Sequence, residues 1–390
     1  MLIFETGRVT SGRPQAANCI KREQVEKLWR RCAVWKKMKS KRTLLQLSTC
    51  FSVFLLMNSI FLGSAAGQTA AAGQTSAPAE PTCLTSDELD ASTRAAIQNT
   101  ATRYFQMISQ GDTASLKQNA IPSLANNFTG LENAIKEAQP NLAGGSASPR
   151  APFELKAEGT APIPRAEFLC GIFNASGPTA SSAEFVIPNL PPGNYAVEIL
   201  DESSSKVPYT VSFVLQQSGT DWKLGGLFLR PKQVAGHDSA WYLNQANQYK
   251  SQGHSLSAWL YYLEGRELAI AVPFMETEAT DKLYQQESTM KSPEAPSGGN
   301  TADLTSANGK TYKLTTMFPL AVGEDLDVVV KYQTPSVADT GKTFEDNMAV
   351  MKALVQKYPE LRDAFNGIVA RGVEPSGRDY GTMMQMKELK

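Results

Sequence analysis

Residues 85–110 have the pattern of an amphipathic helix. Apolar residues recur every three or four positions from Leu89 to Ile108, and Thr85, with acidic residues after it, is suited to cap the start. Gly111 stands where the pattern stops, which is a position that glycine favours after a helix. The spacing predicts one long helix over this range, followed by shorter helical stretches before residue 139.

The apolar spacing changes near Phe153. From there to Leu229, short apolar runs are separated by turns rich in proline and glycine, such as residues 191–194. This pattern predicts an antiparallel meander of about five strands. Helices first and strands afterwards predict an α+β domain over residues 83–235, with the helices on one face of a curved sheet.

Two features of this domain resemble a known fold. The long first helix ends in Gly111-Asp112, and the last two predicted strands, Val211–Gln216 and Trp222–Leu229, are joined by a glycine turn. Together they resemble the nuclear-transport-factor-like (cystatin-like) cone fold, over about 150 of the 390 residues. The resemblance implies a conical cavity, in which some members perform isomerase or dehydratase chemistry with Asp/His or Asp/Tyr pairs. Because no histidine precedes His237, an Asp/His pair here would lack its base.

Residues 185–200 also have a second, local resemblance. Their apolar–Pro–Gly–x–Tyr sequence is similar to that of carboxypeptidase-regulatory-like modules. This alternative would make the region a small β-sandwich.

Residues 236–290 are predicted to form a helical hairpin, with helices over 239–252 and 255–272. Small and aromatic residues, such as Ala246 and Tyr262, fall at spacings that resemble a tetratricopeptide helix pair. Only one copy is present, and a single repeat cannot bury its own apolar face, so we expect the hairpin to pack on its neighbours. The alternative is a docking surface for another protein, with these aromatic anchors: Trp241, Trp259, Tyr261 and Tyr262.

The last hundred residues have the pattern of a second small unit. Residues 291–310 are rich in proline, glycine, serine and asparagine and predict a linker. Residues 311–390 then follow a strand–strand–helix–strand–strand order, which predicts a C-terminal α+β unit of ββαββ type.

The N-terminal 66 residues are predicted to be a leader. Residues 43–66 carry no charge, follow a basic cluster and end in Ser64-Ala65-Ala66, as a secretory signal peptide does. Met38 would begin a signal peptide of ordinary length. The alternative is an inner-membrane anchor, because the uncharged run exceeds the ~20 residues that span a bilayer. Either way the rest of the chain is exported, and residues 67–82 form a disordered tether.

Export changes the charge and the cysteine count. The leader holds 12 of the 38 basic and 3 of the 38 acidic side chains, so the remaining chain has a net charge of −9. This charge argues against nucleic acid as a partner, and against a membrane contact other than through the N-terminal segment. Cys83 and Cys170 remain after the leader, and an oxidising compartment favours a disulfide between them over two unpaired thiols.

The sequence carries no recognisable catalytic or cofactor motif. It lacks P-loop, dinucleotide-binding, zinc-protease and serine-hydrolase signatures, and its two histidines, His237 and His254, offer little for a metal site. We therefore expect no catalytic residue, cofactor or metal, although enzymatic activity stays open.

The whole chain resembles uncharacterised secreted bacterial proteins, which implies a periplasmic or secreted location. We expect an exported envelope protein that binds an unknown protein or a small apolar ligand, or acts as a scaffold. A purely structural role is a further possibility. The enzymatic alternative is a cone-fold isomerase or dehydratase that acts on a small apolar molecule.

Overall fold

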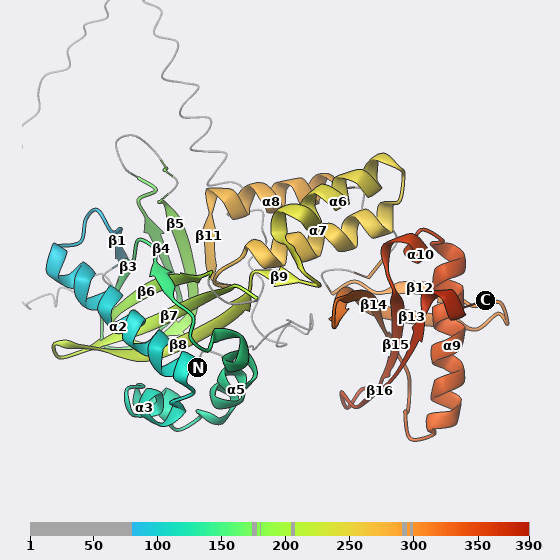
Figure 1. The fold of residues 1–390 in the computed structure, drawn as a ribbon, viewed down its shortest axis with the longest axis horizontal. Helices are drawn as coiled ribbons and strands as arrows, with labels where there is room; N and C mark the ends of the chain where they lie inside the picture. Colours follow the sequence, from blue (N-terminus) through green and yellow to red (C-terminus); the bar gives the residue numbers. More distant parts are fainter. Residues whose placement is uncertain are drawn as a thin grey trace, which may run out of the picture. The chain divides into compact units, whose positions relative to one another are not determined.

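The computed structural model describes residues 80–173, 178–179, 181–203, 207–290, 295–296 and 299–389. The leader, with its predicted signal or anchor at 43–66, lies outside these residues, as does the tether up to residue 79. In the part of the chain that is described, no helix is both long and apolar enough to cross a membrane. The described chain contains both helices and sheets, which confirms the α+β class (Figure 1).

The N-terminal half begins with a three-residue strand, Thr82–Leu84, whose first residue lies in the range predicted as tether, and helices then follow as predicted. They are α2 (Ala91–Gln110), α3 (Thr113–Gln118), α4 (Pro122–Ala125) and α5 (Thr129–Leu142). The first of them begins later than expected, because Thr85 closes a separate turn by donating its N–H to Glu88 Oε2 at 2.7 Å. The side chain of Asp90 caps α2 instead. Gly111 ends this helix with a φ of 74°, a left-handed conformation in which glycine has no steric penalty.

These helices cover one face of a sheet. Its strands are β1 (Thr82–Leu84), β2 (Ala147–Pro149), β3 (Phe153–Ala157), β6 (Gly193–Glu202), β7 (Tyr209–Ser218) and β8 (Asp221–Pro231). They run in the order β1-β3-β6-β7-β8, with β2 paired to β6. Apolar residues of the helices, such as Tyr104 and Ile108, pack against sheet residues that include Phe213 and Leu215.

The other face of this sheet is covered by a second sheet, which the predicted meander lacks and which the β-sandwich alternative for residues 185–200 would include. Strands β4 (Ile163–Cys170) and β5 (Ala183–Leu190) leave the expected meander and pair with β11 (Met275–Thr277). Phenylalanines from both sheets fill the space between them, and Phe153 and Phe185 meet edge to face at 5.1 Å. The single meander is therefore wrong, because β6 and β7 bury apolar side chains on both faces and need a cover on each.

The predicted disulfide is present and joins the two sheets. Cys83 lies in β1 of the larger sheet and Cys170 in β4 of the smaller one, with their Cα atoms 5.1 Å apart. The bond therefore fixes one sheet over the other.

The hairpin contains α6 (Ser239–Ser251) and α7 (Ser255–Ala269), preceded by the short strands β9 (Gln233–Val234) and β10 (His237–Asp238). A further helix, α8 (Glu278–Thr289), packs on α7, where Tyr262 donates its hydroxyl to the carbonyl oxygen of Leu283 at 2.7 Å. Strand β11 follows α7 in the chain and pairs with β5 of the N-terminal domain. The smaller sheet therefore contains residues from both sides of the domain boundary predicted at residue 235.

The C-terminal unit is a five-stranded sheet with a helix on one face (Figure 1). Its elements are β12 (Ala302–Thr305), β13 (Thr311–Val322), β14 (Asp325–Gln333), α9 (Thr340–Lys357), α10 (Leu361–Ala364), β15 (Gly367–Val373), β16 (Asp379–Gln385) and a 3₁₀ turn (Met386–Glu388). The strands run in the order β12-β13-β14-β15-β16, and β14 and β15 are parallel. Strand β12 falls within the range predicted as a linker.

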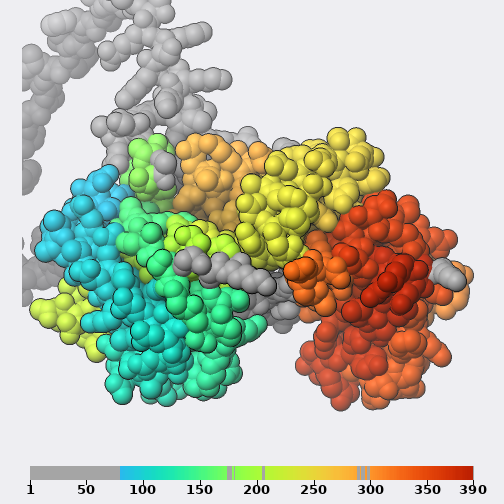
Figure 2. Space-filling model, in the orientation of Figure 1, coloured from blue at the N-terminus to red at the C-terminus, as the bar shows by residue number. Residues whose placement is uncertain are grey.

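The hairpin and the C-terminal unit share one apolar core. Residues of α6 and α7 cluster with residues of β13, β14 and α9, and the yellow and orange-red surfaces meet in Figure 2. Tyr261 of α7 donates its hydroxyl to the carbonyl oxygen of Ala364 at 2.6 Å. The hairpin thus packs on its neighbour, as expected for a helix pair with a single repeat.

Candidate functional site

The aromatic side chains proposed as docking anchors are mostly inside the protein. Trp259, Tyr261 and Tyr262 are 5%, 5% and 2% exposed. Their side chains belong to the core shared with the C-terminal unit. These three residues therefore do not form the exposed aromatic patch of the docking alternative, because the core takes up the apolar face that a partner would have covered.

Trp241, the fourth proposed anchor, is only partly buried at the edge of the same core. Its indole stacks on the imidazole of His237, with ring centres 3.6 Å apart and planes at 6°. Asp238 accepts a hydrogen bond from the Trp241 N–H at 2.9 Å, which caps α6. His237 and Trp241 thus form a local stack at the start of α6, and Trp241 is the one of the four proposed anchors that is only partly buried.

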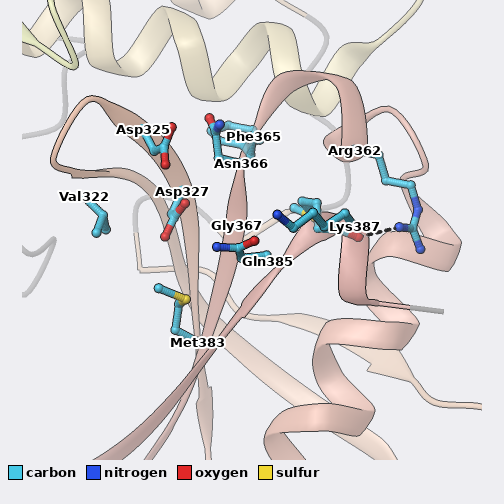
Figure 3. Close-up of a pocket in the computed structure, with 11 residues that line it drawn as sticks. Val322, Asp325, Asp327, Arg362, Phe365, Asn366, Gly367, Met383, Gln385 and Lys387 are labelled. Atoms are coloured by element: carbon cyan, nitrogen blue, oxygen red, sulfur yellow. Dashed lines mark hydrogen bonds between the residues drawn. The ribbon is translucent and has the colours of Figure 1, made fainter.

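A pocket of about 360 Å³ opens at one end of the C-terminal sheet (Figure 3). Its walls come from the β13–β14 turn, from α10 and the start of β15, and from the end of β16 with the turn after it. The lining residues are Val322, Asp325, Asp327, Arg362, Phe365, Asn366, Gly367, Met383, Gln385, Met386 and Lys387.

Asp327 is the least exposed charged side chain of this pocket. Its side chain is 3% exposed. It lies on the face of β14 that is opposite to the helix-covered core. Gly367 lies beside it in the parallel pairing of β14 and β15. A Cβ atom at Gly367 would lie only 2.7 Å from Asp327 Oδ1. The glycine therefore leaves the space that the carboxylate occupies, in keeping with the close approach that an absent side chain permits.

A second carboxylate, Asp325, stands two residues earlier on the same face of β14. Burial, followed by the negative charge of Asp325, raises the pKa of Asp327, while the Gly367 N–H acts in the opposite direction. A cation placed between the two carboxylates would offset both effects. Figure 3 shows Asp325, Asp327 and Asn366 close together on one side of the pocket.

The positive side chains of the pocket differ in what they do. Arg362 donates to the carbonyl oxygens of Met386 at 2.8 Å and Leu389 at 2.6 Å, so it holds the turn after β16. Lys387 belongs to that turn, is exposed, and also lines the pocket. The pocket thus has carboxylates on one wall and an ammonium group on another.

A buried carboxyl group in the N-terminal domain is a second candidate. Glu198 is 0% exposed, and neither of its carboxyl oxygens has a hydrogen-bond partner among the described residues. Its neighbours Ala196 and Leu200 pack with the helices, so Glu198 faces the helix layer. Burial raises its pKa to about 8, against the effect of the nearby Ile199 and Arg150 backbone N–H groups.

No metal site is found in the part of the chain described, because no group of three or more histidine, cysteine or acidic residues converges there. Comparison with known proteins adds no relative, since no family model, curated protein or solved structure matches the chain.

Neither carboxyl group was predicted as a site residue, although the sequence holds a signal for each. Asp327 lies within LDVVVKY and Glu198 within YAVEIL, so each is an acid inside a run predicted to be a buried strand. A charged residue in such a run is costly to bury unless something compensates it. The pattern alone does not say whether the acid faces solvent or the core.

Proposed function

We propose that this protein is an exported, non-enzymatic binding protein of the bacterial envelope. The disulfide between Cys83 and Cys170 supports export, because such bonds persist mainly in oxidising compartments. The acidic charge of the chain after the leader fits the same location. A purely structural scaffold would not require a polar pocket with an almost fully buried carboxylate.

We propose that the C-terminal pocket binds a small molecule that carries an ammonium group. The observation that carries this proposal is Asp327, which is 3% exposed in the pocket with a second carboxylate beside it. A positively charged group there would relieve the repulsion between Asp325 and Asp327 and replace water lost on burial. Lys387 on the opposite wall favours a ligand that also carries a carboxylate. Such a zwitterion differs from the small apolar ligand expected from the sequence.

Three probes with a five-carbon chain test this function. Cadaverine has two ammonium groups, 5-aminopentanoate has one ammonium and one carboxylate, and pentanoate has only the carboxylate. Isothermal titration calorimetry should detect the two amines and not pentanoate, with 5-aminopentanoate the tightest. Asp327→Asn, which keeps the shape of the side chain, should weaken amine binding at least tenfold. Glu324→Gln is the control, since Glu324 is an exposed acid of the β13–β14 turn that does not line the pocket. Equal binding by wild type and Asp327→Asn would contradict the proposal.

Glu198 favours the enzymatic alternative, a cone-fold isomerase or dehydratase acting on a small apolar molecule. The helix layer over a sheet in the N-terminal domain supports a cone-like fold, although the second sheet is an addition to it. A carboxyl with a pKa of about 8 would act near neutral pH as an acid or a base. Glu198 lies opposite Phe213 in the β6–β7 pairing, and the Phe213 ring is 6.2 Å from that of Tyr104.

A simple proton-exchange reaction tests this alternative. In deuterium oxide, a carboxylate beside a bound ketone takes an α-proton and leaves an enolate. The carboxyl group exchanges that proton for a deuteron from the solvent and returns the deuteron to the α-carbon, which regenerates the ketone and the carboxylate. If Glu198 is such a base, wild type should speed deuterium uptake into cyclohexanone and Glu198→Gln should not. Mass spectrometry of the ketone measures the uptake. If uptake with the protein is no faster than in buffer alone, Glu198 does not act as a base and the enzymatic alternative is wrong.

A further inference from the structure

Strand β16, residues 379–385, is an edge of the C-terminal sheet. Among the described residues it pairs with β15 and with no other strand. An unpaired edge invites another strand, and proteins usually protect it with lysine, proline or a bulge. This strand contains neither lysine nor proline, and its register with β15 runs unbroken from Asp379 to Gln385. The edge is thus long and regular, without these common protections.

Two hydrogen bonds determine which backbone groups of β16 point outward. The Glu374 N–H donates to the Arg378 carbonyl oxygen at 2.9 Å at one end, and the Met386 N–H donates to the Asn366 carbonyl oxygen at 2.9 Å at the other. Between these ends, antiparallel pairing alternates. The residues whose N–H and C=O groups point away from β15 are therefore Asp379, Gly381, Met383 and Gln385.

These outward groups are arranged so that β16 complements itself. If a second β16 runs antiparallel about a two-fold axis through Thr382, Gly381 lies opposite Met383 of the second copy, and Asp379 lies opposite Gln385. Met383 is 50% exposed, so a bulky apolar side chain would lie against a residue without one. Arg371 donates to both oxygens of the Asp379 carboxylate, each at 2.8 Å, so the negative charge at that end is balanced.

We propose that β16 pairs with the same strand of a second copy of this chain, so that the two five-stranded sheets become one. This is an isologous contact, in which one two-fold axis uses the same strand twice. On the face covered by α9, Thr382 would lie opposite itself and Tyr380 opposite Met384. No like charges are opposed in this register, and a shift by one residue would direct the hydrogen-bonding groups of one strand away from the other.

The mass of the protein in solution, measured with a charged edge variant, is the first test. Sedimentation equilibrium of the protein as purified from its host should give twice the chain mass at high concentration. Met383→Lys should shift it to the single-chain mass, because lysine at an exposed edge disfavours strand addition. Phe344→Lys is the control, since Phe344 lies on α9 and is 45% exposed, close to the value for Met383. It should leave the dimer intact.

Amide hydrogen exchange then identifies the strand. Exchange of the Gly381 and Met383 amides should slow at least tenfold as the protein concentration rises. The Thr382 amide, already paired with β15, should exchange slowly at every concentration. A protein that stays monomeric at millimolar concentration, or a dimer in which the Gly381 and Met383 amides remain fast, would overturn the proposal.

Discussion

Glu198 lies directly opposite Phe213 in the pairing of β6 with β7, with its carboxyl group inside the helix-covered core. Neither carboxyl oxygen has a hydrogen-bond partner among the described residues. A buried carboxyl without partners favours the neutral form, so the folded protein binds a proton here that the unfolded chain releases.

This relationship predicts a pH-dependent stability. The pKa of Glu198 is about 8 in the folded protein against 4.5 for an ordinary glutamic acid, so the stabilising protonated form is lost as pH rises through this window. The free energy of unfolding should fall between pH 5 and pH 8 by on the order of 1.4 kcal/mol per pH unit from this group alone. Glu198→Gln should remove that slope and be the more stable protein at pH 8.

Urea unfolding at pH 5, 6.5 and 8 measures the effect. Glu137→Gln changes an exposed acid on α5 and should keep the wild-type slope. A Glu198→Gln variant with the same slope as wild type would mean that another group causes the pH dependence.

Removing the disulfide should destabilise the N-terminal domain. Cys83 and Cys170 are 87 residues apart in the sequence, and the bond closes a long loop between two sheets. In the chain-entropy model a loop of this size contributes on the order of 4 kcal/mol. The double variant Cys83→Ser/Cys170→Ser should therefore show a lower urea midpoint than the oxidised wild type.

Reduction offers an independent check of that prediction. Dithiothreitol should lower the melting temperature of the wild type and leave that of the double variant unchanged. If reduction has no effect on the wild type, the bond contributes little to stability.

Tyr261→Phe should weaken the contact between the hairpin and the C-terminal unit. The hydroxyl of Tyr261 donates to the Ala364 carbonyl oxygen at 2.6 Å, and the side chain is 5% exposed. Loss of a buried hydrogen bond that leaves an acceptor without its partner costs about 1–3 kcal/mol. Chemical denaturation of both proteins measures the loss. Tyr380→Phe removes a hydroxyl from a partly exposed strand residue and should cost less than about 0.5 kcal/mol.

Two glycine-to-alanine changes within helices should have opposite signs. At Gly265 in α7, an added Cβ would lie 2.9 Å from Leu243 Cγ and 3.1 Å from the Leu243 backbone nitrogen. The helices α6 and α7 would have to move apart, at a cost of about 1–3 kcal/mol. At Gly130 in α5 nothing lies within 4 Å of such an atom, so the better helix propensity of alanine should add up to about 1 kcal/mol.

Thermal and urea unfolding of Gly265→Ala and Gly130→Ala test this pair together. A stabilised Gly265→Ala variant would mean that the hairpin is less tightly packed than the structure indicates.

The sequence predicted most strands and helices, but it did not predict which sheet a strand joins. The alternating pattern of β7 and β8 is plain in TVSFVLQQ and DWKLGGLFL. The same kind of pattern in β4 and β5 says only that these segments are strands, because period alone carries no information on pairing partners. Helix α8 was missed because it has few apolar residues, and β12 because four residues are too few for a pattern to show.

The candidate site was harder to predict for a related reason. Large aromatic residues such as Trp259 indicate burial or docking equally well, and the choice depends on whether another part of the chain covers them. Asp327 owes its place in a pocket to Gly367, which lies 40 residues later in the chain and on a different strand. Such a pair becomes visible only when the strand register is known.

Strand β11 shows that the N-terminal domain is completed late in synthesis. The third strand of the smaller sheet is β11, at residues 275–277 after the first two hairpin helices. It pairs with β5, which lies about 90 residues earlier in the chain. During synthesis the domain would therefore wait for this strand while the edge of β5 stays unpaired. A fragment that stops at residue 235 would lack the strand permanently, whereas one that continues to residue 290 would include it, together with α8. The N-terminal domain therefore folds as a segment that extends beyond residue 235, the boundary predicted from the sequence.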